Sequence, residues 1–106
     1  MKRRSAQTPE APDAVDRLVR AFLALRNPEH VRAFLEDLCT PAELEAMTDR
    51  WRVVPLLQKG IPYREIHDLT GVSVTTIGRV ARTLERGAGG YAIAARRQQA
   101  RAFASH

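Results

Sequence analysis

Residues 61–84 read IPYREIHDLTGVSVTTIGRVARTL, and this stretch decides the fold. Apolar residues recur at helical spacing on both sides of Gly71, namely Tyr63, Ile66 and Leu69 before it and Val74, Ile77, Val80, Ala81 and Leu84 after it. A tight corner between helices needs a residue that tolerates positive φ, as glycine does. Ser73 can then cap the second helix with its side-chain oxygen. The pattern predicts a helix-turn-helix over residues 62–85.

The positive charge of the chain is concentrated in the half that contains this motif. The net charge of the 106 residues is +5. Residues 50–106 carry 10 Lys or Arg against 3 Asp or Glu, a net +7, whereas residues 1–49 carry 7 against 9, a net −2. This asymmetry favours a polyanionic partner. The single cysteine, Cys39, excludes an intrachain disulfide and is interpreted as a buried thiol.

Four further helices are predicted around the motif, which makes the fold class all-α with about six helices. The first begins at Asp13, and the second runs from the Asn27-Pro28-Glu29 cap to about residue 38. The third begins at the capping box of residues 40–43 and ends near Lys59-Gly60, with a kink or an early end expected at Pro55. The last begins near Tyr91. Residues 1–12 are expected to form a flexible basic arm, and residues 13–106 a single domain.

Catalysis, metal binding and membrane insertion find no support in the sequence. His30, His67 and His106 lack the spacing of a metal site, and there is no glycine-rich phosphate loop or nucleophile elbow. We therefore expect no enzyme activity, no metal and no cofactor. No apolar run approaches the roughly 18 residues of a membrane span, and no signal peptide is recognisable. A cytoplasmic location is expected.

Four short motifs follow one another in a specific order: Leu38-x-Thr40-Pro41-x-Glu43, Arg50-x-Arg52, Arg64-Glu65 and Thr76-Ile77-x-Arg79. With these motifs, residues 15–95 resemble the Trp-repressor superfamily, and more closely its YerC/YecD branch. The resemblance implies an all-α, intertwined homodimer of bacterial, nucleoid-associated type. Each chain of that dimer presents one helix-turn-helix, over residues 62–85 here.

The resemblance also implies a function. It indicates a sequence-specific regulator of transcription, most simply a repressor, that binds double-stranded DNA by placing the helix-turn-helix in the major groove of a pseudo-palindromic operator. The implied base-facing positions are Val74, Thr75 and Gly78. Arg64, His67 and Thr76 are expected near phosphates or the groove edge, and the exposed positions Ser73 and Arg79 complete the predicted DNA-binding set.

The family's ligand-contacting positions fall on Thr40, Arg50, Arg79 and Thr83. Val80, however, stands where the tryptophan-responsive members have glycine, which leaves room for the indole ring. A β-branched side chain would occupy that space, and forcing extra carbon atoms into a packed site typically costs about 1–3 kcal/mol. We therefore expect a vestigial pocket that does not bind tryptophan.

A second interpretation stays open. The basic helical dimer could be an interaction module that binds RNA or a protein partner, with the helix-turn-helix serving only as scaffold. The variants Thr75→Glu and Arg64→Glu distinguish the two interpretations, since only DNA binding by the helix-turn-helix requires these positions.

Overall fold

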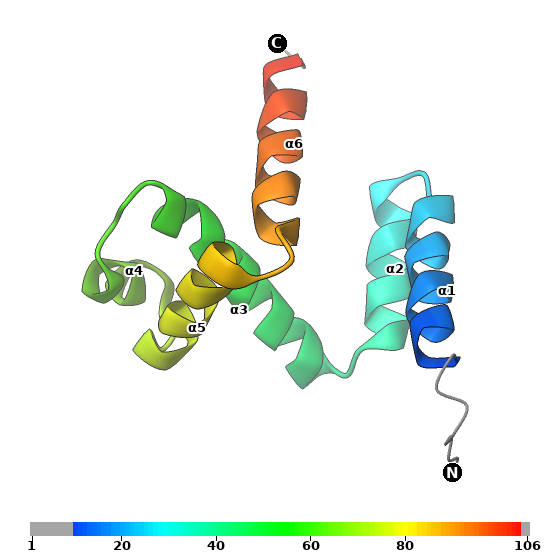
Figure 1. Cartoon of the computed structure of the whole chain (residues 1–106), viewed down its shortest axis with the longest axis horizontal. Helices are drawn as coiled ribbons and strands as arrows, with labels where there is room; N and C mark the ends of the chain where they lie inside the picture. The colour runs from blue at the N-terminus through cyan, green and yellow to red at the C-terminus, as the bar shows by residue number, and fades with distance from the viewer. Residues whose placement is uncertain (1–9, 105–106) are drawn as a thin grey trace. The chain divides into compact units, whose positions relative to one another are not determined.

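A computed structural model describes residues 10–104, which form six α-helices and no strand (Figure 1). The predicted all-α class is confirmed. None of the helices in this range combines the length and the apolarity needed to cross a membrane. The helices are α1 (Glu10–Ala24), α2 (Pro28–Leu38), α3 (Pro41–Gln58), α4 (Tyr63–Thr70), α5 (Val74–Arg86) and α6 (Gly90–Ala104).

The chain divides into two compact units, Met1–Thr40 and Pro41–His106. The first contains α1 and α2, and the second contains the other four helices. Residues 1–9 of the predicted arm lie outside the described residues. Whether residues 13–106 act as one domain stays a prediction.

Local side-chain chemistry determines where the helices of the first unit begin. The α1 helix starts at Glu10, before the predicted Asp13, because a proline such as Pro12 is tolerated in the first helical turn. At the start of α2, Oδ1 of Asn27 accepts a hydrogen bond of 2.8 Å from the His30 N–H, and Pro28 occupies the first turn. The predicted cap is confirmed.

The first unit leaves much of its apolar surface uncovered within one chain. The rings of Phe22 and Phe34 pack edge to face, with centroids 5.1 Å apart, and this contact links α1 to α2. No residue of α2 is buried, and Leu23 of α1 is 77% exposed. Further exposed apolar residues of α1 are Val15, Leu18 and Val19. Cys39, interpreted from the sequence as a buried thiol, is only half-buried, since it follows the last residue of α2.

The second unit is built on α3, which contacts α4, α5 and α6. Its core consists of Val53, Val54, Ile66, Val72, Ile77 and Val80, each at most 4% exposed. The half-buried Trp51 lies beside this core. The centroid of its ring is 6.3 Å from the ring centroid of Tyr91 at the start of α6. Burial of six aliphatic side chains from α3, the turn after α4 and the two short helices fixes the orientation of α4 and α5 on α3.

The α3 helix continues through Pro55 to Gln58, so the early end expected there is wrong, whereas the alternative expectation of a kink stays a prediction. A proline removes its own N–H from the helix, but its carbonyl still accepts, and the Lys59 N–H donates to it at 3.1 Å. The carbonyl four residues before Pro55 has no N–H to accept from. Because Pro55 is exposed, water can bond this carbonyl instead. The predicted stop is confirmed at Gly60, which has φ +79°. The N–H of Gly60 donates to Leu57 and that of Ile61 to Leu56, which is the Schellman pattern.

Two apolar residues of α4 allow a test of this core. Ile66 is fully buried, whereas Leu69 is 60% exposed. Ile66→Ala should lower the free energy of unfolding by about 2–5 kcal/mol, because it removes buried methyl groups and leaves a cavity. Leu69→Ala, the matched control, should change it by no more than about 0.5 kcal/mol. Urea denaturation followed by circular dichroism measures both, and equal losses would show that α4 packs differently.

Candidate nucleic-acid interface

The turn between α4 and α5 has the geometry predicted from the sequence. Gly71 adopts the left-handed conformation, with φ +78° and ψ −1°, and its N–H donates to the His67 carbonyl at 2.8 Å. A residue with a Cβ pays for this conformation, so glycine is the residue that suits it. Val72 then turns inward and is 4% exposed. The turn therefore connects the two helices and also contributes to the core.

Two side chains of α4 form hydrogen bonds with the backbone of the turn, and neither bond was predicted from the sequence. The Thr70 hydroxyl donates to the Ile66 carbonyl at 2.7 Å and accepts from the Val72 N–H at 3.1 Å. Nδ1 of His67 lies 2.8 Å from the Val72 carbonyl oxygen. Because a carbonyl oxygen only accepts, Nδ1 carries the hydrogen in this contact. Both backbone polar groups of Val72 are thus bonded to side chains of α4.

Ser73 caps α5 as predicted. Its Oγ accepts from the Thr76 N–H at 3.1 Å and also donates to Thr76 Oγ1, again at 3.1 Å. These bonds use a hydroxyl that the sequence analysis placed in the DNA-binding set, and Thr76 itself is half-buried. The structural contribution of both residues is therefore to hold the first turn of α5.

The opposite face of α5 is exposed. Ile77 and Val80 are buried against α3, so positions offset by half a helical turn face outward. This outer stripe consists of Thr75, Gly78, Arg79, Arg82 and Arg86. Val74 at the start of the helix is 50% exposed. Of the predicted DNA-binding residues, Thr76 and Gly78 are half-buried and the other six are exposed.

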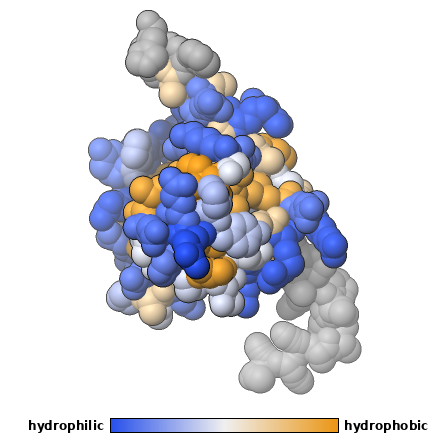
Figure 2. Space-filling model, turned by 90° about the vertical axis from the view of Figure 1, so that its left-hand side faces the viewer, coloured by the Kyte–Doolittle hydropathy of each residue, from blue (hydrophilic) through white to orange (hydrophobic). Residues whose placement is uncertain are grey.

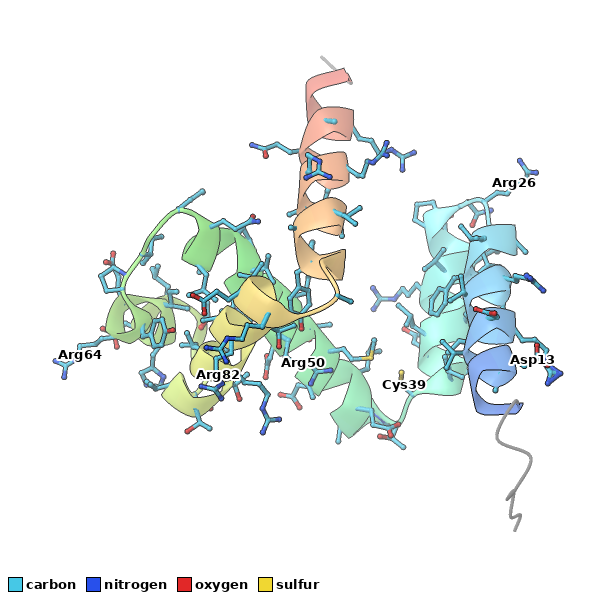
Figure 3. The ribbon with its side chains drawn as sticks, viewed as in Figure 1. Asp13, Arg26, Cys39, Arg50, Arg64 and Arg82 are labelled. Atoms are coloured by element: carbon cyan, nitrogen blue, oxygen red, sulfur yellow. The ribbon has the colours of Figure 1, made fainter. Side chains whose placement is uncertain are left out.

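The view onto the side that carries α4 shows hydrophobic surface at its centre, surrounded by hydrophilic side chains (Figure 2). The large hydrophobic residues exposed on α4 and α5 are Tyr63, Leu69 and Val74. Arg64 projects outward from α4 (Figure 3). The surface therefore combines apolar contact area with cationic side chains, as nucleic-acid interfaces do.

The arginines on these two helices are not neutralised within the described chain. Ion pairs among the described residues join Arg17 with Asp13, Arg32 with Glu36, and Arg52 with Asp49, and none of them involves α4 or α5. Arg79, Arg82 and Arg86 lie along one side of α5 and, with Thr83 and Gly87, line a shallow hollow. Their charge is available to an anionic partner.

Gly78 provides room on the exposed stripe. A Cβ added at Gly78 would lie 3.6 Å from Nη1 of Arg82 and 3.9 Å from Cε2 of Tyr63. Both distances are ordinary van der Waals contacts, so alanine fits here without strain. Glycine leaves this part of α5 without a side chain of its own.

The residues of the predicted vestigial pocket are only partly in positions suited to a ligand. Val80 is 1% exposed and belongs to the core. The Thr83 hydroxyl donates to the Arg79 carbonyl of its own helix at 3.1 Å. Arg50 is half-buried on α3. Thr40 belongs to the first compact unit, so its place in such a pocket stays a prediction.

The model of the family described as Trp repressor protein matches residues 13–99, most of the chain. The chain belongs to the Trp repressor family. Members of this family are regulators rather than enzymes, so membership supports a general role as a DNA-binding regulator. The resemblance inferred from the sequence motifs is thereby confirmed.

Individual relatives agree with this assignment. The chain is 36% identical over 80 residues to YerC of Bacillus subtilis, an uncharacterized protein, with 76% of this chain and 77% of YerC covered. Among solved structures, a candidate Trp repressor from Staphylococcus aureus is 34% identical, with a TM-score of 0.77, over 82% of this chain and 87% of that one. A TrpR-like protein from Eubacterium eligens has the same identity and TM-score, with 82% and 90% covered.

Two glycine substitutions should change stability in opposite directions. Gly78→Ala should raise the free energy of unfolding by about 0.5–1 kcal/mol, because alanine is favoured over glycine inside a helix and fits here. Gly71→Ala should lower it by about 1–2 kcal/mol, because φ is +78° although no atom lies within 4 Å of the added Cβ. Chemical denaturation of both variants measures the difference. A loss of stability in Gly78→Ala would contradict the described packing around Tyr63 and Arg82.

Proposed function

We propose that this chain is a homodimeric transcriptional regulator, most simply a repressor, which binds double-stranded DNA sequence-specifically with α5 in the major groove. The observation that carries the proposal is the turn at Gly71. It holds α5 with its buried stripe on the core and its outer stripe exposed. A helix presented in this way fits the major groove, where each base pair shows a distinct pattern of donors and acceptors.

Bases would be contacted by the start of α5. Val74 and Thr75 are exposed there, and the half-buried Gly78 lies one turn further on. Small apolar and hydroxyl groups suit thymine methyl groups and water-mediated contacts, a mode for which the Trp repressor is a known example. The six exposed members of the predicted set, together with Thr76 and Gly78, form the proposed DNA-binding surface.

Phosphates would supply much of the affinity. Arg64 on α4 and Arg79 on α5 are exposed and make no ion pair with described residues. His67 is exposed beside the turn. Cationic side chains that displace counterions make binding fall steeply with salt concentration.

The apolar surface of α1 and α2 supports a dimer. Val15, Leu18, Val19 and Leu23 are exposed apolar residues of α1. A second copy of the chain would bury them in a dimer. A symmetric dimer carries two copies of α5, so its operator would be pseudo-palindromic, with half-sites about 34 Å apart. Such a protein would work in the cytoplasm, at the nucleoid.

The same charge pattern also fits the alternative, a basic module that binds RNA or a protein partner. The turn geometry favours DNA, since it presents an outer face of α5 that has small residues at its start and arginines further along. A scaffold role does not require that face to be exposed.

Negative charge introduced on the proposed surface should separate these functions. Thr75→Glu and Arg64→Glu should each weaken binding to a selected operator by at least about tenfold, because the polyanionic DNA repels a carboxylate at either position. The matched control for Arg64→Glu is Arg97→Glu, which makes the same charge change at an exposed position of α6. Fluorescence anisotropy measures affinity, and analytical ultracentrifugation checks that the dimer persists. Unchanged binding by both variants would support the scaffold interpretation.

Tryptophan should not act as an effector. Val80 is 1% exposed and belongs to the same buried cluster as Val53 and Val54, so an indole ring at this position would have to displace a core side chain. Isothermal titration of tryptophan into the protein should give only the heat of dilution, and the affinity for DNA should be the same with and without tryptophan. Binding in the micromolar range would refute this part of the proposal.

A further inference from the structure

The head of the Arg82 side chain lies over Gly78, one turn toward the start of α5. Its Nη1 is 3.6 Å from the position that a Cβ of Gly78 would take. Tyr63, the first residue of α4, brings Cε2 to 3.9 Å from the same point. A guanidinium and an aromatic ring from two different helices thus gather at the one position of the outer stripe that has no side chain.

Helix geometry explains why the side chain runs in this direction. Cα–Cβ bonds point toward the N-terminus of a helix, so a long side chain covers the turn that precedes its own Cα. Arg82 is four residues after Gly78 and therefore reaches across that position. A long side chain at position 78 would compete for the same space. Glycine at position 78 therefore leaves the space that the arginine side chain occupies. The guanidinium of Arg82 is displaced toward the N-terminus of α5, which begins at Val74.

This displacement changes what Arg82 can contact. The first turns of a recognition helix approach base edges, whereas its later turns move away from them. The Cα of Arg82 belongs to the later part of α5, but the head of its side chain lies beside Gly78, which is one turn closer to the start of the helix. A guanidinium there offers a planar fork of N–H donors, which matches the O6 and N7 acceptors of guanine.

Among described residues, nothing anionic holds the Arg82 guanidinium. The ion pairs of the described chain do not include Arg82. The other arginines of the stripe, Arg79 and Arg86, have no comparable gap before them, since Thr75 and Arg82 occupy the positions four residues earlier.

We propose that Arg82 determines sequence specificity by donating two hydrogen bonds to one guanine in each half-site, across the space left by Gly78. This inference rests on the proposed function. It adds a base-reading residue outside the set derived from the family resemblance, and it assigns guanine as the base that is read.

Selection of bound sequences from a random double-stranded DNA library tests the inference. The full-length wild-type chain should enrich a pseudo-palindromic motif with a guanine in each half-site. Arg82→Ala should reduce the preference for that guanine by about tenfold or more and leave the preferences at other positions in place. Arg82→Lys is the second variant, because lysine keeps the charge but replaces the planar fork with a single ammonium. It should retain affinity for DNA and weaken the guanine preference less than Arg82→Ala does, because an ammonium can still donate to the guanine acceptors.

Arg86→Ala is the matched control, one turn further along the same stripe. It should weaken binding to all sequences by a similar factor and keep the motif. If Arg82→Ala enriches the wild-type motif unchanged, Arg82 contacts only phosphate or solvent, and the inference is wrong while the proposed function stands. If the wild-type chain enriches no motif, the proposed function fails and the inference fails with it. Urea denaturation confirms that each variant is folded.

Discussion

The left-handed turn at Gly71 is the constraint on which the rest of the second unit depends. The backbone must reverse there so that Ile66 before the turn and Ile77 after it reach the same core. Val72 is buried between them, and side chains of α4 bond both its N–H and its carbonyl. Backbone groups that are buried without partners are costly, so these two bonds are what makes the inward position of Val72 tolerable. The orientation of α5 follows from this turn.

On the proposed function, Val80 is the residue that separates this chain from ligand-controlled members of its family. In this chain it lies in the core, where it contributes to the packing of α5 on α3. A helix held by the protein's own side chain has a fixed position, whereas a helix held by an exchangeable ligand can be moved by that ligand's concentration. On the proposed function, the reading helix of this chain is set permanently, and regulation would depend on the amount of protein and on the operator.

The turn and the helix caps were predictable from the sequence, whereas the facing of each helix and the directions taken by long side chains were not. Gly71, Ser73 and Asn27 act within four residues, so their positions alone indicated the turn and the caps. Pro55 and Leu69 depend on which side of their helices faces the core, which no local pattern specifies. The bonds from His67 and Thr70 to Val72, and the position of Arg82 over Gly78, needed the folded coordinates. The family resemblance indicated the DNA-binding set, but it assigned no closing role to the turn's side chains.

The contact between His67 and Val72 also determines which nitrogen of the ring donates. Since the carbonyl oxygen only accepts, the hydrogen of the neutral imidazole lies on Nδ1. Nε2, which takes no part in this bond, is then an acceptor. The turn therefore holds an exposed ring in one tautomer, and a partner that approaches Nε2 meets a hydrogen-bond acceptor rather than a donor.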